Sequence, residues 1–261
     1  MNVPQTHLLE YLGAEETNLL VSMNLCKRDM DFFPKLDGLF QEPLKYIDLK
    51  VKNKAELTHD DKHRMTVLTL YLYVHYHLYS AFSTMLRCHL SDALSQTRMA
   101  IDAAFTAARL IREPATLNAY LERHADYRNI KRTVSDANKK QETEYPGTGP
   151  LVEMHEICSQ FGSHADVSSF IHRVEITEPD ELGKSLMRLL MFQKPDSDLE
   201  FRYYLVQILS SFSQMLWLFR DFVGDVAKGI EKEKWVAVIA QTISAIQKES
   251  EQIEAAMKKA A

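Results

Sequence analysis

The chain has 261 residues, of which 46% are hydrophobic and 26% are charged, and its formal net charge is −5 at pH 7. This composition is typical of a folded globular protein, and the negative charge excludes a general attraction to nucleic acid or to an anionic membrane. The three cysteines are widely spaced and form no CxxC pair, which excludes a disulfide framework and a zinc knuckle. We therefore expect a soluble protein of the reducing cytoplasm.

The N-terminal part has the weakest helical periodicity. The stretch "THLLEYLGAEETNLLVSMNLC" predicts one or two short helices broken near Gly13, and it lacks the basic start and uninterrupted apolar run of a signal peptide. Three further residues are expected to interrupt the segment that follows: Pro34, Gly38 and Pro43. We predict an N-terminal helical extension over residues 1–57 that packs against a body formed by residues 58–261.

The body begins with strong helix signals. Thr58 is placed as an N-cap before the acidic residues of "THDD", and the run from there to Arg87 is apolar around most of its circumference. Such a run is typical of a central, buried helix. A second helix is predicted from Ser91 to Arg112, because Pro114 stops it and fits the first turn of a third.

The second half contains a loop, a short helix and one more central helix. "TEYPGTGP" predicts a loop, and Gly162 is placed to end the helix "LVEMHEICSQF". The range 172–192 alternates in part like a strand, so a small β-hairpin competes there with a helix. Ser197 then opens a capping box with Glu200, and the helix that it begins is predicted to continue to about Gly229.

The last segment, residues 235–258, carries a heptad-like apolar stripe. Such a stripe either forms a homodimer or packs back onto the chain's own bundle. The periodicity along the chain predicts an all-α helical bundle of about five to seven helices in a single compact unit.

One charged pair and one histidine stand out as candidate catalytic residues. Arg98 and Asp102 lie four residues apart, so they share one face of a helix. They form a structural ion pair, or Asp102 steadies Arg98 while it holds an anion. His164, which follows the helix end at Gly162, either hydrogen-bonds another helix or moves a proton near neutral pH. We favour the structural interpretation of both features.

Four side chains of metal-ligand type lie close together in the sequence: His155, Cys158, His164 and Asp166. Their spacing matches no common zinc pattern, and HExxH is absent because Ser159 stands where the second histidine would be. A metal-dependent hydrolase is therefore an alternative, and we predict no metal site. The sequence also has no glycine-rich phosphate loop, no GxSxG elbow and no kinase signature, so no cofactor is expected.

Basic residues are concentrated in one segment. Between Arg98 and Lys140 there are nine Lys and Arg residues against five Asp and Glu residues. The candidate binding residues of this patch are Arg123, His124, Arg128, Lys131, Arg132, Lys139 and Lys140. The patch would contact RNA or a protein, or it would serve only as a solvated helix face.

Residues 60–175 resemble uncharacterised bacterial helical proteins related to the HEPN superfamily. The resemblance rests on "DALSQTRMAIDAAFTAARLIREPATLNAYLER" and on "CSQFGSHAD". In it, Arg98 matches the family's central arginine, Asp102 replaces the usual glutamate, and His164 belongs to the closing segment. The resemblance implies a HEPN-like helical bundle.

HEPN relatives include RNases of toxin–antitoxin and phage-defence systems as well as non-catalytic members that bind nucleotides or proteins. Catalytic members carry an arginine four to six residues before a histidine, whereas those positions before His164 are Gln160, Ser159 and Cys158. We therefore expect a non-enzymatic protein that binds a protein or nucleic-acid partner, in a bacterial defence or toxin–antitoxin context. The alternative is an RNase or nucleotide-processing enzyme that uses Arg98 and His164.

Overall fold

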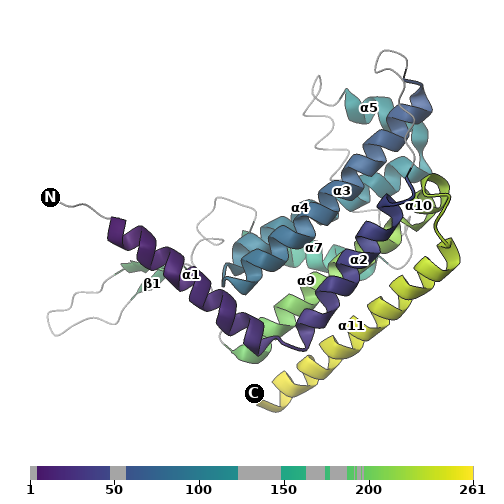
Figure 1. Cartoon of the computed structure of the whole chain (residues 1–261). Helices are drawn as coiled ribbons and strands as arrows, with labels where there is room; N and C mark the ends of the chain where they lie inside the picture. Colours follow the sequence, from purple (N-terminus) through teal and green to yellow (C-terminus); the bar gives the residue numbers. More distant parts are fainter. Residues whose placement is uncertain are drawn as a thin grey trace, which may run out of the picture.

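The structure of the chain is a computed structural model that describes residues 5–47, 57–122, 148–162, 174–176, 187–190, 192, 195 and 197–260. It is an all-α helical bundle, as the sequence predicts. Its helices are α1 (Gln5–Leu25), η1 (Asp29–Asp31), α2 (Phe32–Leu44), α3 (His59–Leu86), α4 (Leu90–Arg112), η3 (Pro114–Thr116), α5 (Leu117–Leu121), α7 (Gly149–Gly162), α9 (Asp198–Leu218), α10 (Arg220–Val226) and α11 (Lys232–Ala260). Figure 1 shows most of the long helices side by side, with α1 projecting away from them.

Helices α3 and α4 pack against each other as a hairpin, and local hydrogen bonds close both ends of α3. The hydroxyl of Thr58 accepts from the Asp61 N–H at 3.1 Å, and the Asp61 carboxylate accepts from the Thr58 N–H at 3.0 Å. This capping box confirms the predicted helix start. At the other end, Cys88 has a φ of 63°, and the His89 N–H donates back to the Thr84 carbonyl at 3.1 Å. This is the Schellman geometry that usually requires glycine.

The α3 helix is less buried than its composition predicts. Its inner face buries Val67, Tyr71, Val74, Leu78, Ala81 and Met85. Its outer face leaves Leu72, Tyr76 and Tyr79 exposed, although they lie in the same apolar run. The prediction of a helix buried all round is therefore wrong for this face.

Helix α9 is the central helix of the second half, in contact with α2, α3, α4, α7 and α11. The Ser197 hydroxyl accepts from the Glu200 N–H at 3.1 Å, as expected for its N-cap. The helix does not continue to Gly229, since α9 ends at Leu218 and α10 starts at Arg220. The intervening Phe219 is fully buried, so the break keeps its side chain in the core.

Helix α11 packs back onto its own bundle, against α9 and α2. Ile239, Ile246 and Ile253 of the predicted stripe are buried there, and Ser250 accepts from the Gln207 side chain at 2.8 Å. A homodimer through residues 235–258 stays a prediction, and it would have to use the outer side of this helix.

The N-terminal helices are longer than predicted. Helix α1 runs through Gly13, and α2 runs through Pro34, Gly38 and Pro43. Pro34 lies in the first turn, where no intrahelical acceptor is lost. Pro43 lies in the last turn, where its missing N–H frees the carbonyl of Leu39. The expected breaks are therefore wrong, because the two prolines occupy terminal turns and the two glycines weaken a helix interior without ending it.

Three side chains of the body hold α2 in place. The Tyr71 hydroxyl donates to the Phe40 carbonyl at 2.8 Å, and the Trp235 indole N–H donates to the Leu39 carbonyl at 3.0 Å. The His75 ring lies 2.8 Å from the Asp37 carboxylate. Helix α2 is thus fastened to α3 on one side and to α11 on the other.

Two short strands, β1 (Val174–Ile176) and β2 (Met187–Leu189), pair in antiparallel register within the range 172–192.

Helix α7 starts at Gly149, so the last two residues of the predicted loop "TEYPGTGP" belong to a helix, and it ends at Gly162 as expected. Within the described ranges, none of the helices combines the length and apolar character of a membrane span.

Candidate functional site

Arg98 and Asp102 of α4 meet a histidine of α7. His155 Nε2 lies 3.1 Å from Asp102 Oδ1, and Arg98 Nε donates to the same ring nitrogen at 3.4 Å. Arg98 and Asp102 are one helical turn apart, which presents both toward α7. The three side chains form an inter-helix polar cluster, which we call the Arg98 cluster.

The two contacts of His155 Nε2 belong to different tautomers. With a proton on Nε2, the ring donates to Asp102; without it, the nitrogen accepts from Arg98. His155 Nε2 therefore has a hydrogen-bond partner in either tautomer. The side chains of His155 and Asp102 are 19% and 39% exposed, so water reaches the cluster. Chemically, it can hold an imidazole in one orientation between α4 and α7.

Cys158 lies one turn beyond His155 on α7 and is fully buried. Burial raises the pKa of its thiol to about 12, and the nearby charges of Arg98 and Asp102 act in opposite directions on it. A thiol with this pKa stays protonated at neutral pH and is a poor nucleophile and metal ligand. Cys158 therefore contributes packing rather than chemistry.

Two rings of α3 border the cluster. The pKa of Tyr73 is raised by burial and by the negative charge of Asp102. The His77 ring lies edge-on to Tyr73 with centroids 4.3 Å apart, and its buried nitrogens have the Gln96 side chain as their polar neighbour. Burial lowers the pKa of His77, opposed by the nearby Gln96 amide. His77 is therefore held neutral.

Several predicted site residues cannot be placed in this site. His164 and Asp166 lie outside the described residues, so the expected approach of Arg98 to His164 stays a prediction. The basic patch lies outside them too: Arg123, His124, Arg128, Lys131, Arg132, Lys139 and Lys140. In the part of the chain that the structure describes, no group of three or more His, Cys, Asp or Glu side chains could hold a metal ion.

The sequence does not reveal that His155 is the partner of Arg98. The inward face of α7 is visible in the buried residues Leu151, Met154 and Cys158, which follow helical spacing. This pattern puts His155 at the margin of that face. Nothing in the pattern, however, indicates which side chain of another helix it meets.

A second charged cluster joins three elements. Asp29 of η1 is fully buried, and Arg202 of α9 donates to its two oxygens at 2.8 and 3.1 Å. Arg202 also donates to Glu249 of α11 at 2.8 Å. Because a buried carboxylate is stable only when paired, this cluster fixes the N-terminal segment to the bundle.

Comparison of the chain with protein-family models, with curated proteins and with solved structures finds no match.

Proposed function

We propose that the chain is a non-enzymatic, cytoplasmic, HEPN-like helical protein that works by binding a protein partner through α1. The observation that carries the proposal is an exposed apolar face on that helix. Its side chains are between 42% and 67% exposed, and they are Leu8, Leu9, Leu12, Leu20 and Met23.

These five residues share one side of α1. At about 3.6 residues per turn they fall within roughly a third of the circumference. The side of the helix next to this face meets the body: Tyr11 and Glu15 lie 3.4 and 2.9 Å from His89, and Leu19 and Leu25 pack against the core. Helix α1 thus contacts the body through both polar and apolar side chains, and it leaves a further set of apolar side chains exposed. An exposed apolar patch of this kind marks an interaction surface.

The Arg98 cluster supports a structural rather than a catalytic role. Each of its groups has a partner within the protein, and together they join α4 to α7.

The test is site-specific photo-crosslinking in cells, with a benzophenone amino acid at position 12 and, as control, at the exposed Gln252 of α11. Protein adducts from position 12 alone, lost in a Leu9→Glu, Leu20→Glu variant, are expected. An adduct of doubled mass would identify a second copy of the chain as the partner. Background adducts from both positions, or RNA adducts in place of protein, would contradict the proposal.

The second candidate is an RNase or nucleotide-processing enzyme, favoured by the contact between Arg98 and a histidine. In it Arg98 would stabilise a phosphate, and either His155 or His164 would move the proton. Residues 123–140 would contact the RNA. Incubation of total RNA with the wild type, His155→Ala and His164→Ala separates the candidates, because equal background cleavage by all three would exclude this one.

A further inference from the structure

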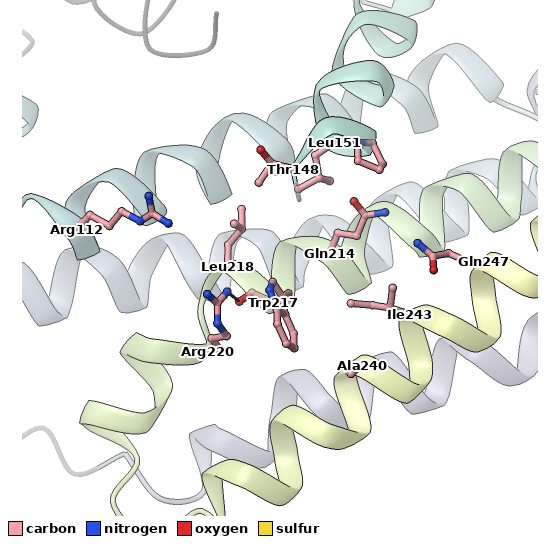
Figure 2. Close-up of a pocket in the computed structure, with 11 residues that line it drawn as sticks. Arg112, Thr148, Leu151, Gln214, Trp217, Leu218, Arg220, Ala240, Ile243 and Gln247 are labelled. Carbon is pink, nitrogen blue, oxygen red and sulfur yellow. Dashed lines mark hydrogen bonds between the residues drawn. The ribbon is translucent and has the colours of Figure 1, made fainter. Parts of the chain in front are cut away.

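A cavity of about 280 Å³ lies where the end of α4, the start of α7 and the facing sides of α9 and α11 meet. It is separate from both the Arg98 cluster and the exposed face of α1. Its wall includes Arg112, Gln214, Trp217, Leu218, Arg220 and Ile243. Figure 2 shows them around a common space.

One end of the cavity is cationic. In Figure 2 the guanidinium groups of Arg112 and Arg220 both lie on the side of the cavity away from Gln247. Arg220 donates to the Trp217 carbonyl at 3.0 Å and stands 3.9 Å from Asp221, which is also 3.5 Å from Lys232. Since Asp221 is shared between two cations, it does not neutralise Arg220 fully. An oxyanion is the complementary ligand group.

One polar atom in the cavity wall lacks a hydrogen-bond partner among the described residues. The Gln214 side-chain nitrogen donates to the Ser210 hydroxyl at 3.2 Å, but the buried Gln214 oxygen has no hydrogen-bond partner among the described residues. A buried acceptor without a partner is costly, and native proteins rarely leave one. A ligand with an N–H or O–H group would satisfy it.

The remaining wall is apolar. The Trp217 ring lies under the Arg220 guanidinium, 4.8 Å from it, and Leu218 and Ile243 line the same space. An aromatic ring or short aliphatic chain would bury its surface here. The cavity is slightly below the usual size of drug-like sites, roughly 300–1,000 Å³, which limits the ligand to about one ring with substituents.

We propose that this cavity binds a small organic oxyanion, namely a carboxylate or phosphate on an aromatic or short aliphatic body that carries one hydrogen-bond donor. Arg112 and Arg220 hold the anionic group, Trp217 and Ile243 cover the body, and Gln214 accepts from the donor. The anionic group, the apolar body and the hydrogen-bond donor of such a ligand each match one part of the cavity wall.

Isothermal titration calorimetry of the full chain with four one-ring probes tests the proposal. Phenylacetate and phenyl phosphate should bind saturably at one site, and whichever binds more tightly identifies the anionic group. Phenylacetamide, which lacks the charge, should bind about tenfold more weakly, as expected for loss of a charged hydrogen bond. 4-Hydroxyphenylacetate should bind more tightly than phenylacetate, and Gln214→Leu should remove that gain.

Arg220→Gln and Arg112→Gln should each lower the affinity for phenylacetate about tenfold. Arg64→Gln on α3 should leave this affinity unchanged. Arg112 is exposed, so its variant stays folded even if Arg220→Gln does not. Three results would overturn the proposal: equal binding of phenylacetamide and phenylacetate, wild-type affinity in Arg112→Gln, or no saturable binding up to about 10 mM probe. None of them depends on the partner of α1.

Discussion

The indole N–H of Trp235 donates to the backbone carbonyl of α2 that Pro43 leaves without its helical partner. In an α-helix, the N–H of residue 43 would donate to the carbonyl of Leu39. Proline has no N–H, and Trp235 of α11 donates to that carbonyl instead, at 3.0 Å. A helix defect is thus repaired by a side chain from the other end of the chain.

This repair makes the effect of Trp235→Phe depend on residue 43. In the wild type, the substitution leaves the Leu39 carbonyl buried and unpaired, which costs about 1–3 kcal/mol of unfolding free energy beyond the packing loss. In a Pro43→Ala background, the new backbone N–H takes the carbonyl, so the cost should shrink. Urea unfolding of the four proteins measures the coupling, and equal costs in both backgrounds would show that the indole does not serve this role.

Asp29 should be among the most sensitive charged positions. Asp29→Asn leaves Arg202 partly buried without its bidentate partner, and we expect a loss of about 3–5 kcal/mol in the free energy of unfolding. The matched control is Asp60→Asn, because Asp60 pairs with Arg64 at the surface and is 65% exposed. The control should change stability by less than about 1 kcal/mol. Denaturant unfolding compares the two, and similar losses would contradict the role of the buried pair.

His77 should make the protein less stable in mild acid. Its pKa is lowered in the folded state by burial, so the unfolded chain binds the proton more readily. Neutral His77 contributes fully to the free energy of unfolding above pH 6.5, which is the ordinary pKa of histidine. This contribution declines as the pH falls below that value. His77→Phe removes this dependence. The stability difference between wild type and variant should therefore grow from pH 7 to pH 5, and a constant difference would argue against this titration.

The cysteine thiols should be unreactive in the folded protein. Burial raises the pKa of Cys26 and of Cys158 to about 12, so both remain protonated at pH 8. Iodoacetamide labelling followed by mass spectrometry should modify them readily only after unfolding in urea. Rapid labelling of Cys158 in the native protein would show that it is accessible and would reopen a chemical role for it.

Local signals in the sequence predicted the helices well. Thr58 and Ser197 cap the helices that they were expected to begin, because a cap is decided by residues within one turn. The same locality explains the errors at Pro43 and Phe219. Whether a helix survives a proline, or breaks without one, depends on tertiary partners and on the core, which no short window contains.

The site shows the same division. That Arg98 and Asp102 share a face follows from their spacing alone. Their partner His155 is more than fifty residues away, and its contact with them depends on how α7 lies against α4. The sequence therefore indicates which residues can take part in such a cluster, but not which of them meet.

The bond between Trp235 and Leu39 also limits when the protein can finish folding. The two residues are 196 positions apart. At the usual pace of translation, α2 emerges from the ribosome roughly 10–40 s before the indole that secures it. The attachment of α2 to α11 is consequently a late event in synthesis, and until then the nascent chain holds its first helices by contacts with helices made earlier, among them α3 and α9.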